Sequence, residues 1–270
     1  MVNPGNTAVW IVTRNCNLRC PYCTQTDNSR VDTRIYTEWV VAWNRICPDL
    51  LLISGGEPFL LPGFVDMLKD LHSSIKLGIT TNLTLPMDEF ARCIDPKRVL
   101  NITCSRHPSM YKQPAEMFDG KVMLLVAKGF RVTVNLVAHP DQMYLIPRLK
   151  KHYEAMGVNF HVDPYREGEE MGRFNYDWKE KLFLQRYVQS DREDLLKDVK
   201  YNKAFCSAGQ DYIFVEPNGD YWPCMLHRTR RTEPRGNVFV DANVFRNGTV
   251  CGEYHFCLGC DRDSTTVEIV

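Results

Sequence analysis

The run CNLRCPYC at residues 16–23 decides which fold this sequence can adopt. It directly follows an apolar run at residues 7–13, whose β-branched side chains predict a strand. The next predicted strand, residues 50–54, leads in the same way into the run SGGEP at residues 54–58. Because the carboxyl ends of parallel strands meet at one edge of a sheet, we expect both loops at the edge where α/β folds place their active sites.

The three cysteines of the first loop, Cys16, Cys20 and Cys23, have the spacing C-x3-C-x2-C. Soft thiolates suit iron–sulfur clusters, and three of them can hold three corners of a four-iron cube while one iron stays open to another molecule. Zinc is the alternative, but structural zinc normally takes four ligands, often from two C-x2-C pairs, and this loop has no fourth nearby. The spacing therefore favours a cluster.

The second loop has groups that suit an amino acid. Gly55 and Gly56 would leave backbone N–H groups open to an anionic group, and the Glu57 carboxylate could accept from an ammonium group. Taken alone, the same residues equally predict a tight turn with a solvated glutamate. Their position beside the cysteine loop favours the binding site.

The first two-thirds of the chain alternates strand-like and helix-like segments, which predicts an α/β fold with parallel strands and right-handed crossovers. Six such units are fewer than the eight of a closed barrel. The predicted strands are Thr7–Thr13, Leu50–Ser54, Lys76–Thr81, Val99–Cys104, Arg131–Val137 and Asn159–Asp163. The predicted helices are Thr37–Ile46, Leu61–His72, Met87–Ile94, Ala115–Lys128, Tyr144–Met156 and Trp178–Gln189.

The alternation of strand-like and helix-like segments ends near Cys206. Two short strands, Asp211–Val215 and Tyr221–Cys224, flank an Asn-Gly pair at residues 218–219, which predicts a β-hairpin. We therefore divide the chain into residues 1–195 and a small extension of residues 196–270.

Composition narrows the class of protein. The 270 residues carry 33 basic and 33 acidic side chains, so a strongly basic nucleic-acid footprint is missing. No apolar run reaches membrane-spanning length and the N-terminus has no signal-peptide pattern, so we expect a cytoplasmic protein without membrane partners. The 11 cysteines are an odd number, and in the reducing cytosol they indicate metal binding rather than disulfides.

Together, the C-x3-C-x2-C loop and the downstream GGEP resemble the radical S-adenosylmethionine (SAM) superfamily over roughly residues 7–190. The resemblance implies a partial (β/α)6 barrel and a [4Fe–4S] cluster whose open iron binds the amino and carboxylate groups of SAM. It also implies reductive cleavage of SAM to a 5′-deoxyadenosyl radical that abstracts a substrate hydrogen, with an electron donor such as flavodoxin or ferredoxin. The SAM contacts that it implies are Gly55, Gly56 and Glu57 for the amino group, Tyr22 near the adenine, and Thr81, Asn82, Ser105 and Asn135 for the ribose or carboxylate.

Four cysteines of the extension form a second candidate metal site. They are Cys206, Cys224, Cys257 and Cys260, with Cys251 as a spare. Zinc, a cluster and unpaired buried thiols are all compatible with these residues. The arrangement resembles the twitch form of the SPASM extension of radical SAM enzymes, which implies one auxiliary cluster, expected to be [4Fe–4S].

An auxiliary cluster that accepts an electron suggests net oxidation of a small molecule, such as an alcohol to a ketone in natural-product biosynthesis. The alternative is a peptide-modifying enzyme that forms a crosslink or an epimer. With only six residues before the first strand, the chain has no room for the N-terminal peptide-recognition domain that many such enzymes carry. A non-catalytic metal protein and a tRNA- or nucleobase-modifying enzyme are disfavoured by the paired motifs and by the neutral charge, respectively. Tyr165 and Arg166, after the sixth strand, are candidate substrate contacts.

Overall fold

A computed structural model describes residues 6–25, 35–112, 114–167, 172–188, 196, 204–230, 232–246, 249–251 and 267–269. Its main element is a nine-stranded sheet with the strand order β12-β11-β10-β1-β2-β3-β4-β5-β6. Strands β1 to β6 pair in parallel in chain order, as the βα alternation predicted. They are β1 (Thr7–Thr13), β2 (Leu50–Gly55), β3 (Lys76–Thr81), β4 (Val99–Ser105), β5 (Val132–Ala138) and β6 (Asn159–Pro164).

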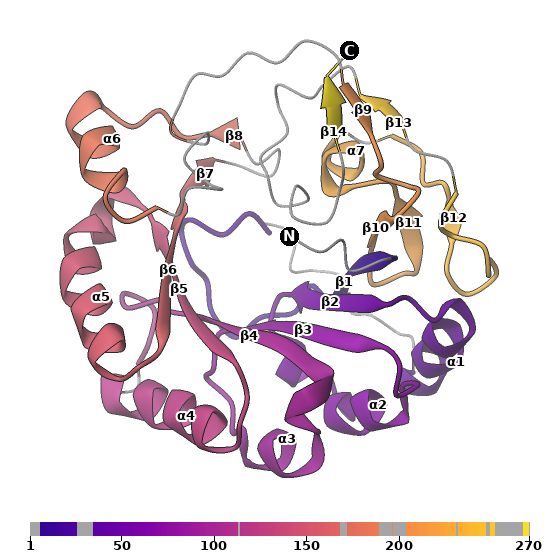
Figure 1. Cartoon of the computed structure of the whole chain (residues 1–270), viewed down its shortest axis with the longest axis horizontal. Helices are drawn as coiled ribbons and strands as arrows, with labels where there is room; N and C mark the ends of the chain where they lie inside the picture. The colour runs from indigo at the N-terminus through magenta and orange to yellow at the C-terminus, as the bar shows by residue number, and fades with distance from the viewer. Residues whose placement is uncertain are drawn as a thin grey trace.

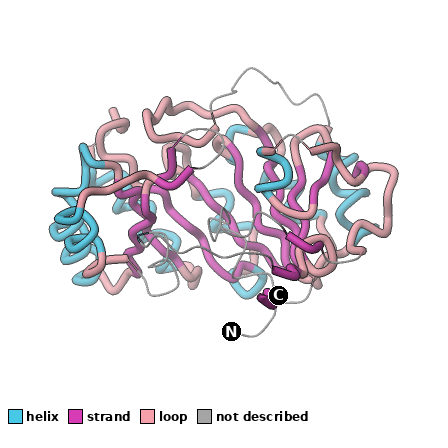
Figure 2. The backbone as a smooth tube through the Cα atoms, turned by 90° about the horizontal axis from the view of Figure 1, so that it is seen from above, coloured by secondary structure: helices cyan, strands magenta, loops and turns pink. Residues whose placement is uncertain are grey.

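Helices lie on the outer side of this curved sheet (Figure 1). They are α1 (Tyr36–Ile46), α2 (Phe64–Asp70), α3 (Asp88–Cys93), α4 (Ala115–Ala127), α5 (Ile146–Ala155) and α6 (Trp178–Leu184). Helices α2 and α5 start two or more residues later than predicted. Gly63, in the left-handed conformation, precedes α2, and a 3-10 stretch that begins at Pro140 precedes α5. The sheet does not close on itself, so the expected partial barrel is confirmed (Figure 2).

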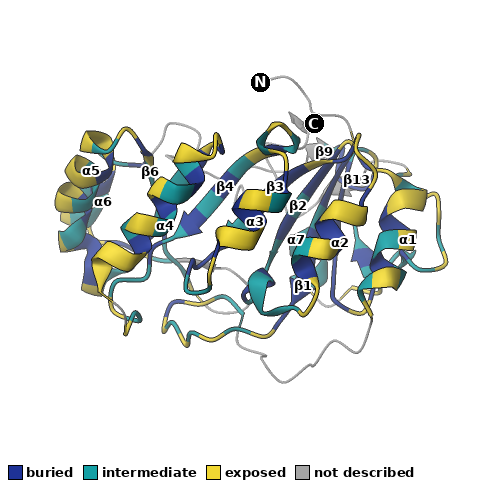
Figure 3. Ribbon diagram, turned by 90° about the horizontal axis from the view of Figure 1, so that it is seen from below, coloured by how far each residue is buried: buried dark blue, intermediate teal, exposed yellow. Residues whose placement is uncertain are grey.

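The core lies between the sheet and the inner faces of the helices, while the outer helix faces are exposed (Figure 3). Trp10 of β1 packs against Trp39 and Trp43 of α1, with ring centroids 4.5 and 5.5 Å apart. All three indoles are fully buried. Burial of a large apolar side chain contributes about 1.5–3 kcal/mol, so this cluster fixes α1 on the first strand.

The C-terminal hairpin is confirmed, and it extends the barrel sheet. Strand β10 (Tyr212–Val215) pairs in parallel with β1, and then antiparallel with β11 (Asp220–Trp222). Gly219 has a φ of +87°, which explains the glycine of the turn. Strand β12 (Gly236–Asn237) ends the sheet, and the short helix α7 (Met225–Thr229) follows β11.

Two smaller sheets complete the described part of the chain. One is formed by β9 (Ala204–Cys206), β13 (Thr249–Cys251) and β14 (Val267–Ile269), and the other by β7 (Arg166–Glu167) and β8 (Gly172–Arg173). Among the described residues, no helix combines the length and the apolar character that crossing a membrane requires.

Candidate active site

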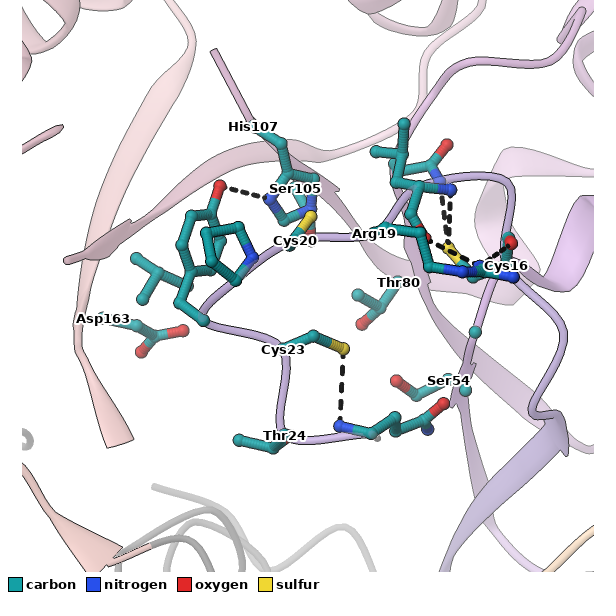
Figure 4. Close-up of a pocket in the computed structure, with 18 of the residues that line it drawn as sticks. Cys16, Arg19, Cys20, Cys23, Thr24, Ser54, Thr80, Ser105, His107 and Asp163 are labelled. Atoms are coloured by element: carbon teal, nitrogen blue, oxygen red, sulfur yellow. Dashed lines mark hydrogen bonds between the residues drawn. The ribbon is translucent and has the colours of Figure 1, made fainter. Parts of the chain in front are cut away.

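A cavity of about 620 Å³ opens at the carboxyl ends of the barrel strands, where the sequence predicted the site. Its volume falls in the usual range for small-molecule and cofactor pockets. Figure 4 shows the three cysteines around this space, together with Ser54, Thr80, Ser105 and Asp163 from the ends of β2, β3, β4 and β6. The predicted residues that line it are Cys16, Cys20, Tyr22, Cys23, Gly55, Gly56, Thr81, Asn82, Ser105 and Arg166.

The cysteine loop is held by its own backbone. The Cys23 amide donates to the Cys20 carbonyl at 3.0 Å, which closes a turn between the second and third cysteines. Backbone amides of Leu18 and Gln25 donate to the sulfur atoms of Cys16 and Cys23, each at 3.4 Å. The loop thus already supplies hydrogen-bond donors to two sulfur atoms of the candidate ligand set.

Burial raises the pKa values of the Cys16 and Cys20 thiols. The pKa of Cys20 rises to about 12, first because of burial and then because of the neighbouring Cys23 and Cys16. Burial also raises the pKa of Cys16, while the Leu18 amide acts against it. Three clustered thiolates are therefore unfavourable without a cation, and metal binding, which displaces thiol protons, removes this cost.

The two glycines of GGEP allow the end of β2 to lie close beside the end of β1, with which it pairs in parallel. A Cβ atom at Gly56 would lie 2.0 Å from the Asn15 carbonyl oxygen, and one at Gly55 would lie 2.3 Å from the Thr13 oxygen. The expectation of an open N–H group is wrong for Gly56. The backbone amides of Gly56 and Glu57 donate to the carbonyls of Thr13 and Asn15, at 2.7 and 2.8 Å, because the parallel pairing of β1 and β2 brings these groups together.

The Glu57 side chain is fully buried and faces the end of β3. Its carboxylate accepts from the Thr81 hydroxyl at 2.8 Å, from the Asn82 amide at 2.7 Å and from the Phe59 amide at 3.1 Å. Burial raises its pKa, and these donors oppose the rise. Glu57 thus fixes the loop after β3, and it is not among the residues that line the cavity.

Tyr22 forms one wall between two histidines. Its hydroxyl is hydrogen-bonded to His107 Nδ1 at 3.0 Å, and its ring centroid is 5.7 Å from that of His107 and 5.5 Å from that of His139. Burial, followed by the nearby Arg106, lowers the pKa of His107 to about 4, so this imidazole is neutral.

Asn135 lies behind the wall rather than in it. Its amide nitrogen donates to Asp163 Oδ2 at 2.9 Å, and Asp163 lines the cavity. The second Asp163 oxygen lies 3.5 Å from His161 Nε2. Asn135 Oδ1 is buried and has no hydrogen-bond partner among the described residues.

The two substrate candidates differ in position. Arg166, in β7, lines the cavity. Tyr165 instead packs edge-on against His139, at 4.9 Å between ring centroids, and its amide donates to the Tyr176 hydroxyl at 2.7 Å. Tyr165 is therefore in the wall behind Arg166.

The structure describes half of the second cysteine set. Cys206 ends β9 and Cys224 directly precedes α7, and both are half-buried. Figure 1 shows β9 and α7 in the same part of the molecule, beside the hairpin. Cys257 and Cys260 lie outside the described residues, and so does the side chain of Cys251.

Sequence reasoning missed residues that shape the site from a distance. Tyr111 donates its hydroxyl to the carbonyls of Asn82 and Ser105, and Lys121 donates to the carbonyls of Leu83 and Thr84. Neither residue belongs to a motif. Thr80 and Asp163 also line the cavity, and their positions at strand ends were the available signal.

Comparison with known proteins agrees with this geometry. The family model described as the Radical SAM superfamily matches residues 10–144. A probable GTP 3′,8-cyclase of Methanocella arvoryzae is 36% identical over 78 residues, which are 27% of this chain and 25% of that protein. A 7-carboxy-7-deazaguanine synthase of Aquifex aeolicus is 29% identical over 126 residues, 42% of this chain and 55% of that protein.

Two solved structures share the fold. SuiB of Streptococcus suis, bound to precursor peptide SuiA, has a TM-score of 0.66 and 17% identity, over 89% of this chain and 64% of that one. Native anSMEcpe with bound AdoMet has a TM-score of 0.63 and 16% identity, over 96% of this chain and 90% of that one. The chain thus spans less than two-thirds of the length of SuiB. Its matches cover 25% of the cyclase and 55% of the synthase.

Proposed function

Because the chain belongs to the radical SAM superfamily, we propose that it binds a [4Fe–4S] cluster through Cys16, Cys20 and Cys23 and uses SAM in the adjoining cavity for a hydrogen-abstraction reaction. The observation that carries the proposal is that all three cysteines line one cavity beside the paired ends of β1 and β2. When bound, the cluster supplies the electron that cleaves SAM to methionine and a 5′-deoxyadenosyl radical.

The residues present fit both groups. The thiols of Cys16 and Cys23 already accept backbone hydrogen bonds, as cluster thiolates do. For Asn135, which lies behind the wall, we propose a supporting role, because its side-chain amide donates to the Asp163 carboxylate that lines the cavity. We assign the polar SAM contacts to Thr81, Asn82 and Ser105, and the adenine contact to Tyr22, because these residues line the same cavity.

Other residues of the chain hold and shield this site. Gly55 and Gly56 let the loop after β2 lie against the start of the cysteine loop without a steric clash. Glu57 fixes the end of β3, where Thr81 and Asn82 line the cavity. His107 and His139 pack against the Tyr22 ring and hold it in the cavity wall. We propose Arg166 as a substrate contact, with Tyr165 supporting its loop.

For the reaction, we propose net oxidation of a small molecule. The support is the cysteine set Cys206, Cys224, Cys257 and Cys260, which would hold an auxiliary cluster in residues 196–270 as the electron acceptor. A second candidate is peptide modification. It is supported by SuiB, which shares the fold and has been solved with its precursor peptide.

Anaerobic reconstitution with iron, sulfide, SAM and dithionite tests the proposal. We expect about four irons per chain for one cluster and about eight for two. Mass spectrometry should detect 5′-deoxyadenosine formed without added substrate. Cys20→Ala should abolish this product, and Cys224→Ala should remove only the second set of irons.

The matched control is Cys93→Ala, at the end of α3 and outside the cavity lining, which should leave iron content and SAM cleavage unchanged. Zinc without sulfide in the wild-type protein would rule out the radical enzyme. To distinguish the two reactions, candidate small molecules and candidate peptides are incubated with the loaded enzyme. Oxidation of a small molecule with no change in any peptide supports the first reaction. A modified peptide with no oxidised small molecule supports the second.

A further inference from the structure

We propose that the side-chain amide of Asn82 donates a hydrogen bond to the Cys16 thiolate and thereby raises the reduction potential of the cluster held there. The proposal rests on the function proposed above, and it gives Asn82 a role in addition to contact with SAM. The observation is a distance of 3.7 Å between Asn82 Nδ2 and Cys16 Sγ. Asn82 is 5% exposed and Cys16 is half-buried, so the contact lies in a partly buried part of the cavity wall.

The amide orientation follows from its hydrogen-bond partners. Asn82 Oδ1 accepts from the Thr84 amide at 3.0 Å and from the Thr84 hydroxyl at 2.6 Å. Because these groups are donors, the oxygen must face Thr84 and the nitrogen must face the cysteine loop. The second N–H of the amide is directed to Asn17 Oδ1 at 3.0 Å.

The backbone of the same residue is fixed from several sides. The Glu57 carboxylate accepts from the backbone amide of Asn82, and the Tyr111 hydroxyl donates to the backbone carbonyl of Asn82 at 2.5 Å. The next residue, Leu83, has a φ of +57°, a conformation that is unfavourable for leucine. Lys121 donates to the carbonyls of Leu83 and Thr84, at 2.8 and 2.9 Å, and so stabilises this turn.

Such a fixed donor has a predictable electrostatic effect. Reduction adds negative charge to a cluster and to its thiolates. A hydrogen bond to a ligand sulfur stabilises the more negative state, and it does so more strongly in a buried, low-dielectric site. Removal of the Asn82 donor should therefore make the cluster harder to reduce.

The test is an EPR-monitored redox titration of the reconstituted protein in three variants. Asn82→Ala removes the donor, and Asn82→Asp replaces it with an acceptor of the same shape. We expect about a tenfold shift of the reduction equilibrium toward the oxidised cluster for Asn82→Ala, about 59 mV for one electron, and a larger shift for Asn82→Asp. Asn17→Ala is the control, because it removes the other partner of the Asn82 amide and leaves the Cys16 contact in place.

Each outcome decides the question. A potential that is unchanged in both Asn82 variants, or shifted equally by Asn17→Ala, overturns the inference. If neither Asn82 variant keeps its cluster, pulsed EPR of the Asn17→Ala protein with side-chain ¹⁵N-labelled asparagine replaces the titration. A ¹⁵N coupling to the reduced cluster supports the inference, and its absence overturns it. Failure of the wild-type protein to bind iron and sulfide would instead contradict the proposed function, so the two failures are distinguishable.

Discussion

Arg14 and Glu216 form a buried ion pair across 202 positions of the sequence. Arg14 lies two residues before the first cysteine of the loop, and Glu216 directly follows β10. Arg14 Nε donates to Glu216 Oε2 at 3.0 Å, and its second nitrogen donates to Oε1. Arg228 of α7 also reaches Oε1, at 2.6 Å. The side chains of Arg14 and Glu216 are only 6% and 8% exposed.

The first prediction is that Glu216→Ala strongly destabilises the protein. Loss of one partner leaves a buried arginine without its counter-charge, which costs about 3–5 kcal/mol. Urea unfolding of the cluster-free protein measures this loss. Glu154→Ala, in the exposed pair with Lys150, is the control and should cost no more than about 0.5 kcal/mol. Equal, small effects of the two substitutions would contradict the importance of the buried pair.

The second prediction concerns the close approach of the GGEP loop to the residues just before the cysteine loop. Gly56→Ala should lower stability by about 1–3 kcal/mol, because its methyl group would overlap the Asn15 carbonyl. It should also lower iron content after reconstitution, since Asn15 directly precedes Cys16. Gly120→Ala is the matched control. Nothing lies within 4 Å of the position that its methyl group would take in α4, and alanine there should stabilise the helix by about 0.5–1 kcal/mol.

The third prediction is a pH dependence that depends on His107. Its pKa is about 4 in the folded protein, below the ordinary value of 6.5 that applies after unfolding. The unfolded chain therefore binds the proton more readily, and stability falls as the pH drops from 6.5 toward 4. The contribution lost reaches about 2–3 kcal/mol near pH 4.

Urea unfolding of the cluster-free protein at pH 7, 6, 5 and 4 measures this dependence. His107→Gln should reduce the slope, because glutamine does not take up the proton. His72→Gln, which replaces a histidine at an exposed site, is the control against which this slope is compared. A slope that stays the same in both variants would mean that other groups dominate the acid response.

The fourth prediction is that Glu57→Gln weakens the loop after β3. Both carboxylate oxygens accept hydrogen bonds, so the amide of glutamine must face a donor, at a cost of about 1–3 kcal/mol. Thermal unfolding should show the loss, and binding of SAM to the loaded protein should weaken with it. Glu89→Gln, exposed at the start of α3, provides the comparison. A Glu57→Gln protein of wild-type stability would contradict the buried, fully bonded carboxylate.

Much of the barrel could be predicted because its signals are local. Strand and helix periods, turn glycines and the spacing of three cysteines are all contained in short windows of sequence. The direction of Glu57 could not be predicted, because GGEP is equally consistent with a carboxylate that faces the cavity and one that faces β3. The parallel pairing of β10 with β1, and the pair Arg14–Glu216, depend on residues about 200 positions apart, and no local pattern indicates such contacts.

The pairing of β1 with β10 also has a consequence for biosynthesis. Strand β1 pairs with β2 along one edge and with β10 along the other, where Thr7 pairs with Tyr212. The second edge of β1 therefore stays uncovered until β10 has been synthesised. While the ribosome completes the intervening residues, this edge presents unsatisfied backbone groups to other chains. Slow translation, or a mutation that delays the hairpin, should therefore increase aggregation of the nascent protein before any cofactor is inserted.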